Sequence, residues 1–281
     1  MSAGARHPIR VAADGEAGRI LVADSYTYCD ARVGPRDVYV GGSFFGAYCA
    51  ALALRWGAKA LIGHAAGIGK DGAGLSGLGL CQGHGVPAAA CETMSARIGE
   101  GKSLWSGSIG HLNAAAEALG VRAGQPVAEA AQRLLAAAPG RMIEESALLA
   151  APLTIVEQGP RGGIFCLVSL SLLDRPRPGD VFCVGSHAGT VLAVFARTIR
   201  PKGVIANDAG LAAERSGIAG LELLDAEGIA AAAVSAQSAR IGDALDTYEA
   251  GVISHANRQS ARAGVVPGMT ARAAAHRLLE A

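Results

Sequence analysis

The five-residue run Ser-Ala-Arg-Ile-Gly at residues 95–99 recurs unchanged at residues 238–242, an offset of 143. Glycines and polar residues on both sides of the run match at this offset or at 144, among them Asp37/Asp180, Lys59/Lys202, Gly67/Gly210, His111/His255 and Asn113/Asn257. Self-similarity over such a length predicts two copies of one structural unit. We therefore predict an internal duplication, with a first repeat at residues 8–138, a connector at 139–151 and a second repeat at 152–281.

Short apolar runs alternate with helical patterns in each copy. In the second copy, the runs 181–184, 203–206 and 229–234 are separated by helical patterns at 189–197 and 217–227. This alternation is typical of a parallel sheet with helices on its faces. The expected fold class is α/β, with two tandem homologous units related by a pseudo-two-fold, each a short parallel sheet flanked by helices.

The ends of each copy carry further predicted elements. The runs 153–157 and 164–169 flank a turn rich in Gly and Pro, which predicts a β-hairpin appended to the sheet. Residues 246–263 read as one long helix that ends at Gly264 and carries His255, and His111 occupies the matching position in the first copy. A terminal helix is expected at 270–279, with Thr270 as its N-cap.

Composition limits the classes of partner. The chain is 51% hydrophobic and 17% charged, and its formal net charge is +1. A chain with so little net charge and no basic stripe is not expected to bind nucleic acid through charge. Abundant apolar residues favour a homo-oligomer as well as a large core. No apolar run is long enough for a membrane helix, and we expect no membrane partner.

The six cysteines contain no Cys-x-x-Cys pair and lie in apolar runs. This pattern predicts reduced core residues and a cytoplasmic location. The amino-terminal residues 1–18 lack the apolar segment of a secretion signal, so export is not expected. His111 and His255 have no Cys, Asp or Glu at metal-ligand spacing, and we expect neither a metal nor a cofactor.

Polar residues follow two predicted strands of the second copy, where ligands of such sheets usually bind. Ser186 and His187 follow one strand, and Asp208 follows the next. A nucleophile, a base and an acid that orients the base are the parts of an acyl-transfer site. These three residues are the candidate catalytic group. Adjacent Ser and His side chains point in different directions, however, and Ser186 could instead cap a helix.

The repeated arginines, Arg97 and Arg240, allow two interpretations. Two guanidinium groups could bind a carboxylate, an imide or a phosphate of a small ligand. Alternatively, each could pair with a nearby protein carboxylate, such as Glu100 or Asp243. The remaining residues expected to contact a substrate are Ser43, Ser95, Asn207, Ser238, His255 and Asn257.

The two copies differ in charge at the strand ends. Lys70-Asp71 stands where the second copy has Ala213-Glu214, and Phe44 stands where it has His187. We expect either one shared site with unlike halves or one active and one decayed site. The active copy would be the second, because it alone carries both His187 and Asp208.

These features predict a cofactor-independent enzyme that acts on a small polar metabolite. Hydrolysis of an amide, a cyclic imide or an ester suits a crevice with Ser, His, Asp and Arg. One alternative is a non-catalytic protein that binds a small anionic metabolite. The other is an oligomeric scaffold whose polar residues only cap and brace the fold.

Overall fold

The computed structural model describes residues 7–150 and 153–281, and it is a mixed α/β structure with two six-stranded sheets. The chain forms two compact units, one of residues 1–65 and 75–149 and the other of residues 66–74 and 150–281. This division agrees with two tandem α/β units. Residues 151 and 152, where the predicted connector ends and the second repeat begins, lie outside the described residues.

The sheet of the first unit has the strand order β1-β2-β3-β4-β5-β6. Its strands are β1 (Arg10–Gly15), β2 (Gly18–Ala23), β3 (Asp37–Phe44), β4 (Ala60–His64), β5 (Ala88–Cys91) and β6 (Ile109–Leu112). Strands β2 to β5 are parallel, whereas β1 and β6 pair antiparallel at the two edges. The expected parallel sheet is therefore present as the centre of a mixed sheet.

The sheet of the second unit has the matching order β12-β11-β10-β9-β8-β7. Its strands are β7 (Thr154–Gly159), β8 (Gly162–Leu167), β9 (Val181–His187), β10 (Gly203–Asn207), β11 (Ala230–Val234) and β12 (Ile253–Ala256). Strands β8 to β11 are parallel, and β7 and β12 are antiparallel edge strands. The predicted hairpin is β7–β8, and its second strand pairs with β9 within the sheet.

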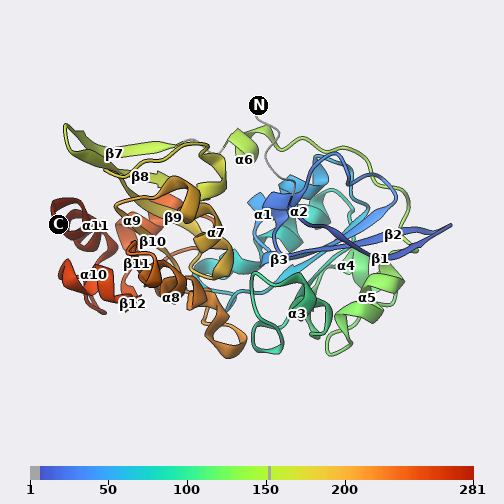
Figure 1. Ribbon diagram of the computed structural model, residues 1–281. Helices are drawn as coiled ribbons and strands as arrows, with labels where there is room; N and C mark the ends of the chain where they lie inside the picture. Colours follow the sequence, from blue (N-terminus) through green and yellow to red (C-terminus); the bar gives the residue numbers. More distant parts are fainter. Residues whose placement is uncertain (1–6, 151–152) are drawn as a thin grey trace. The chain divides into compact units, whose positions relative to one another are not determined.

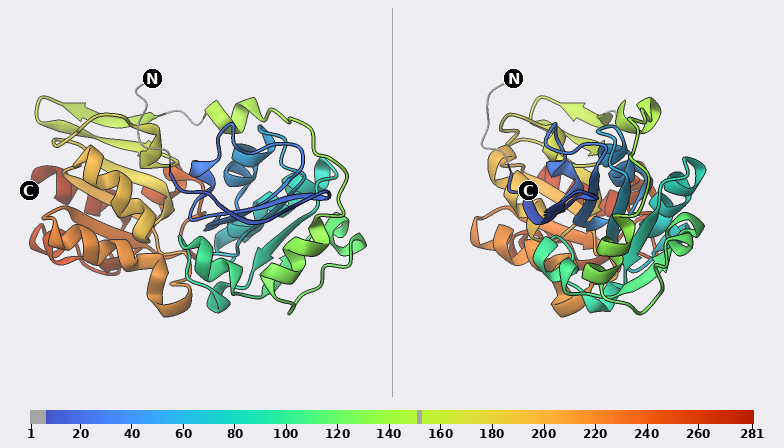
Figure 2. Two further views of the ribbon diagram at one scale, coloured as in Figure 1. Left: turned by 45° about the vertical axis from the view of Figure 1, so that its right-hand side comes forward. Right: turned by 90° about the vertical axis from the view of Figure 1, so that its right-hand side faces the viewer.

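Helices cover both faces of each sheet (Figures 1 and 2). The first unit has α1 (Ala47–Leu54), α2 (Ser76–Gly83), α3 (Gly101–Trp105), α4 (Ala114–Ala118), α5 (Val127–Leu134) and α6 (Ser146–Ala150). The second has α7 (Thr190–Ile199), α8 (Ala219–Ala226), α9 (Ala244–Ala250), α10 (Arg258–Arg262) and α11 (Ala271–Glu280). In the second unit, one core lies between the sheet and α7–α8 and the other between the sheet and α9–α11. Short 3-10 turns add η1 (Tyr26–Tyr28), η2 (Lys70–Leu75), η3 (Thr93–Ser95), η4 (Leu170–Leu172) and η5 (Ala213–Ile218).

The prediction of one long helix at 246–263 is wrong. This segment forms α9, strand β12 and α10, and His255 lies on β12. His111 likewise lies on strand β6 rather than on a helix. The helix ends at Gly251, whose Cβ position would lie 2.2 Å from the Thr247 carbonyl oxygen. The following Val252 and Ile253 are β-branched, and pairing with β11 outweighs the helical spacing of the segment.

The matched lysines have the same structural role in both units. The Lys59 ammonium donates to the carbonyl oxygens of Ala17 and Leu135, both at 2.7 Å, and Lys202 donates to the Leu279 carbonyl oxygen at 2.7 Å. Leu135 and Leu279 lie at the ends of α5 and α11, where carbonyl groups lack helical partners. Each lysine therefore caps the carboxyl end of a matched helix, α5 in the first unit and α11 in the second. As expected, Thr270 caps α11 through its hydroxyl group.

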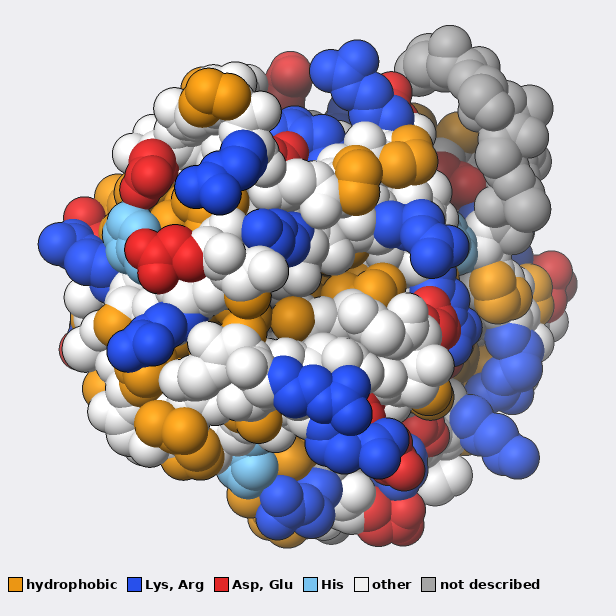
Figure 3. Space-filling model, turned by 60° about the vertical axis from the view of Figure 1, so that its left-hand side comes forward, with side chains coloured by type: hydrophobic (Ala, Val, Ile, Leu, Met, Phe, Trp, Pro, Cys, Tyr) orange, Lys and Arg blue, Asp and Glu red, His pale blue; other side chains and the backbone are white. Residues whose placement is uncertain are grey.

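Most cysteines belong to the core, as the sequence predicts. Cys49, Cys81, Cys91, Cys166 and Cys183 are buried, and Cys29 is partly buried. Among the described residues, the helices are too short or too polar to cross a membrane. The face shown in Figure 3 carries basic, acidic and apolar side chains side by side.

Candidate functional site

The carboxyl ends of β9, β10 and β11 bring several predicted polar residues to one edge of the second sheet. Asp208 follows β10 directly and is 6% exposed. One of its carboxylate oxygens accepts hydrogen bonds from the backbone N–H groups of Gly210 at 3.0 Å and Ala236 at 2.9 Å. These bonds tie the β10 turn to the β11 turn and fix the direction of the Asp208 carboxylate.

The turn after Asp208 has an unusual backbone conformation. Ala209, Leu211 and Ala212 have positive φ angles of 52°, 66° and 56°, and Glu214 and Arg215 have φ angles of 52° and 57°. Residues with side chains rarely adopt this region, because Cβ crowds the backbone there. The matched turn in residues 66–74 also has positive φ angles, at Ala66, Ile68 and Asp71. Such strain gathers at functional sites, so both turns are candidate site elements.

The predicted Ser-His-Asp group is not hydrogen-bonded as a triad among the described residues. His187 is buried, and its Nδ1 accepts a hydrogen bond from the Gly189 N–H at 3.1 Å. Ser186 precedes it within β9, where the register with β10 shifts, and no hydrogen bond between the two side chains is present among the described residues. Neither Ser186 nor Ser43 caps a helix, because the N-cap positions of α7 and α1 are Gly189 and Gly46.

The two matched serines differ in their surroundings. Ser43 is buried, and its hydroxyl group bonds the Ser25 hydroxyl at 3.0 Å and the Tyr26 N–H at 3.1 Å. Ser186 is partly exposed, and its hydroxyl group makes no hydrogen bond to another described residue. Ser43 is therefore part of the packing, whereas the Ser186 hydroxyl remains accessible to a ligand.

A carboxylate acts on the matched histidine in both units, in contact range only in the first unit, and it comes from different positions. In the first unit, Glu92 lies 3.9 Å from His111 and also accepts from the Thr93 N–H at 3.0 Å. In the second unit, Asp208 accepts from the Ala236 N–H, which matches Thr93, and its charge acts on His255. Ser235 stands at the position that matches Glu92, and Ala65 stands at the position that matches Asp208. Each histidine is thus under the influence of a carboxylate, but the carboxylate comes from a different position in each copy.

The pKa of His255 is lowered from its usual value. Burial lowers the pKa of this imidazole, the Arg215 guanidinium lowers it further, and the Asp208 carboxylate partly opposes them. Its Nδ1 lies 3.1 Å from the Ser254 hydroxyl oxygen. An imidazole whose pKa is lowered is suited to accept a proton.

Changing the charges around His255 should move its pKa in opposite directions. We expect Arg215→Gln to raise the pKa of His255, because a repelling cation is removed, and Asp208→Asn to lower it, because an attracting anion is removed. NMR titration of the His255 ring protons measures both shifts. His276→Gln in the same unit is the control and should leave the His255 titration unchanged. Equal His255 pKa values in wild type and both variants would exclude this electrostatic arrangement.

Both repeated arginines pair with carboxylates. Arg97 Nε donates to Glu100 at 2.7 Å. Arg240 contacts Asp71 at 3.0 Å, Asp246 at 3.1 Å and Asp243 at 3.4 Å. Glu100 and Asp243 are the partners expected from the structural interpretation of these arginines. Whether either guanidinium also contacts a ligand stays a prediction.

Lys70 and Asp246 extend this charge network in the second unit. The Lys70 ammonium lies 2.9 Å and 3.0 Å from the two carboxylate oxygens of Asp246, which is 8% exposed. Burial alone would raise the pKa of Asp246. The Arg240 N–H at 2.7 Å and the Lys70 ammonium outweigh it and hold this pKa below its usual value.

Four predicted binding residues bond the backbone, and whether they also contact a ligand stays a prediction. Ser95 accepts from the Ser108 N–H at 3.1 Å, and Ser238 accepts from the Val252 N–H at 2.9 Å. Asn207 donates to the Ala239 carbonyl oxygen at 3.0 Å. Asn257 is the N-cap of α10 and bonds β11 at Ala231, near the amino end of that strand. These contacts fix turns and helix ends.

Sequence reasoning missed Glu92, Arg215 and Asp246 as site residues. For Glu92 and Asp246 the signal is paired substitution between the copies, whereas Arg215 has no such signal. Glu92 with Ala65 becomes Ser235 with Asp208, and Ser103 with Ala213 becomes Asp246 with Lys70. In the first case the carboxylate changes position, and in the second both residues become charged. Only a position-by-position comparison of the copies detects such changes.

Among the described residues, His, Cys, Asp and Glu form no group of three or more that could hold a metal ion. No known protein-family model matches the chain, and no curated protein or solved structure matches it either.

Proposed function

We propose that the protein is a cofactor-independent enzyme that hydrolyses an amide, a cyclic imide or an ester of a small polar metabolite. The proposed site lies at the carboxyl ends of β9, β10 and β11 in the second unit. The observation that carries the proposal is a histidine on the last strand of each unit on which a carboxylate acts, Glu92 at 3.9 Å from His111 and Asp208 through its charge on His255. A histidine needed only for packing would not require a carboxylate that acts on it in both units.

In this proposal His255 is the general base. Its lowered pKa leaves the imidazole neutral, and the Asp208 carboxylate stabilises the imidazolium that forms when a proton is taken up. The proton comes from a water molecule, because Ser186 on β9 lies three strands away from His255 on β12, beyond hydrogen-bond reach. His187, with Nδ1 engaged by a backbone N–H, then positions the end of β9 rather than accepting the proton.

Variants of His255 and Asp208 should separate an effect on catalysis from an effect on folding. His255→Gln and Asp208→Asn should each lower the turnover of a hydrolysed amide, cyclic imide or ester by about 10²- to 10⁴-fold, the usual loss when general-base catalysis is removed. Asparagine keeps an oxygen that can accept from Gly210 and Ala236, so the turn should persist. The measurement is hydrolysis of a panel of these compounds, and His276→Gln is the control that should retain wild-type turnover.

The alternative, binding of a small anion without turnover, predicts a different result. A panel member would then raise the melting temperature without being hydrolysed, by about 2.7 kcal/mol in stability at 100 times its Kd. Full turnover in both His255→Gln and Asp208→Asn would rule out the proposed site. Ser186→Ala tests whether the accessible Ser186 hydroxyl contacts the substrate, in which case KM should rise while kcat is largely kept.

The finer description of the fold is also a proposal. We infer that the two units arose by duplication and are related by a pseudo-two-fold, supported by the repeated sequence and the matching strand order. A homo-oligomer is proposed because edge strands β1 and β7 are largely exposed along their length. The buried free cysteines support a cytoplasmic location.

A further inference from the structure

A cavity of about 310 Å³ lies at the amino ends of β4 and β5 in the first unit. Residues 136–141, which include the start of the predicted connector, form one wall. This wall is fixed in place, because the Gly140 N–H donates to the Pro35 carbonyl oxygen at 2.8 Å and the Ile143 N–H donates to that of Leu54 at 3.0 Å. Gly140 also approaches the chain closely, since a Cβ there would lie 2.1 Å from the Gly57 carbonyl oxygen.

The cavity has an apolar wall and a positive side. Val86, Pro87, Ala115 and Leu119 supply apolar surface. Arg141 also lines the cavity, is exposed, and makes no ion pair or hydrogen bond to another described residue.

Lys59 adds a second positive charge. Lys59 is 4% exposed, and the three hydrogen bonds that its ammonium makes all go to neutral carbonyl groups, those of Ala17, Leu135 and Ala137. The positive charge of Lys59 is thus not neutralised by a contacting carboxylate. The remaining titratable residue of the lining, His84, pairs with Glu145 at 2.6 Å. The field inside the cavity therefore favours an anion.

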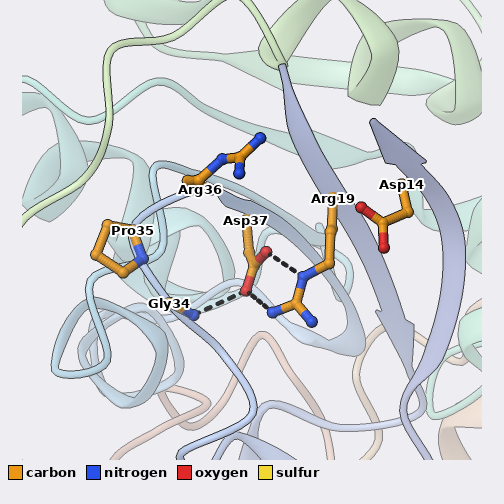
Figure 4. A pocket seen from close by; sticks show the side chains of 6 residues that line it. All are labelled: Asp14, Arg19, Gly34, Pro35, Arg36 and Asp37. Atoms are coloured by element: carbon orange, nitrogen blue, oxygen red, sulfur yellow. Dashed lines mark hydrogen bonds and ion pairs between the residues drawn. The ribbon is translucent and has the colours of Figure 1, made fainter. Parts of the chain in front are cut away.

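A second cavity of similar volume lacks this bias. It lies between the β1–β2 hairpin and residues 34–37, and its charged lining is two arginines and two aspartates (Figure 4). Arg19 makes a two-pronged ion pair with Asp37, at 2.8 Å and 2.7 Å. Arg36 donates to the carbonyl oxygens of Gly15 and Glu16. With its charges balanced and both arginines engaged, this cavity does not select a ligand of one sign.

We propose that the cavity bounded by Lys59 and Arg141 binds a small organic carboxylate with an apolar group. The carboxylate lies near the Arg141 guanidinium, and the apolar group contacts Val86, Ala115 and Leu119. The volume is at the lower end of the range for small-molecule sites, and a mainly apolar wall with few polar groups is typical of them. This site is independent of the function proposed for the second unit.

Isothermal titration calorimetry with hexanoate and benzoate tests the proposal, with hexanamide and benzamide as neutral counterparts. Saturable binding of at least one carboxylate is expected, with its amide at least tenfold weaker. Arg141→Gln should weaken carboxylate binding roughly ten- to a hundredfold, the range for loss of a charge-assisted hydrogen bond. Arg161→Gln, which removes an exposed arginine of the second unit, is the matched control and should bind as wild type.

A second variant tests the position of the apolar group. Ala115→Phe should fill the cavity and abolish binding, while an unchanged circular dichroism spectrum shows that the fold is kept. The proposal fails if neither carboxylate binds saturably, or if an amide binds as well as its carboxylate. Equal carboxylate affinity in wild type, Arg141→Gln and Ala115→Phe would also overturn it, because binding would then lie elsewhere.

Discussion

Replacing Asp246 by serine should lower the free energy of unfolding by about 2 to 3 kcal/mol. Serine can still accept from the Arg240 N–H, as Ser103 does from the Arg97 N–H at 2.9 Å in the first unit. The loss therefore comes from the charge, because Lys70 and the Arg240 side chain no longer contact the buried carboxylate. The Lys70 and Arg240 side chains are both partly exposed, so water can solvate their charges once the carboxylate is gone. The loss in unfolding free energy is therefore smaller than for a fully buried ion pair.

The double variant Lys70→Ala/Asp246→Ser places at these positions the residues found at the matching positions of the other copy, Ala213 and Ser103. We expect it to be more stable than Asp246→Ser alone, since no ammonium is then left without its partner. Lys70→Ala alone should cost about 1 kcal/mol, because Arg240 still pairs with Asp246. Urea unfolding of the four proteins gives the coupling energy directly. Strictly additive losses would show that Lys70 and Asp246 do not stabilise one another.

The pH dependence of stability offers an internal check on Asp246. Its pKa is lowered in the folded protein, so its ion pair stabilises the fold above the unfolded-state pKa of about 3.9. This stabilisation is lost as pH falls through the folded-state pKa. The stability difference between wild type and Asp246→Ser should therefore be constant near neutral pH and shrink below about pH 4.

Alanine at Gly67 or Gly210 should destabilise the second unit by about 3 to 5 kcal/mol, the range of severe backbone and packing damage. Both glycines have positive φ angles, +74° and +64°. They also contact each other, because a Cβ on Gly67 would lie 2.8 Å from the Gly210 Cα atom, and one on Gly210 would lie 2.7 Å from the Gly67 Cα atom. Alanine would thus strain its own backbone and push the two left-handed turns apart.

Gly72 separates these two effects. It also has a positive φ angle, +68°, but a Cβ there would meet no atom within 4 Å. Gly72→Ala should cost only about 1 to 2 kcal/mol, the price of the left-handed conformation alone. The measurement is thermal unfolding of the three single variants. Losses at Gly67 and Gly210 no larger than that at Gly72 would contradict a tight contact between the turns.

The sequence by itself predicted the α/β class, the hairpin of β7 and β8, the strands β9 to β11 and the terminal helix. These elements are set by local patterns, since apolar runs, glycine turns and the Thr270 cap act within a few residues. The repeat also identified Gly67 and Gly210 as matched positions. It could not show that they contact each other, because that depends on how the turns pack.

Only the tertiary structure decided the rest. The segment with His255 became an edge strand rather than a helix, because the free edge of β11 offered backbone hydrogen bonds that a local pattern does not reveal. The pairings of Asp208 with the Ala236 N–H, and of Lys70 with Asp246, join residues 28 and 176 positions apart. Residue type and spacing predict which groups can carry charge, but hydrogen bonds and ion pairs act over only a few ångströms, so chain packing alone decides which of them meet.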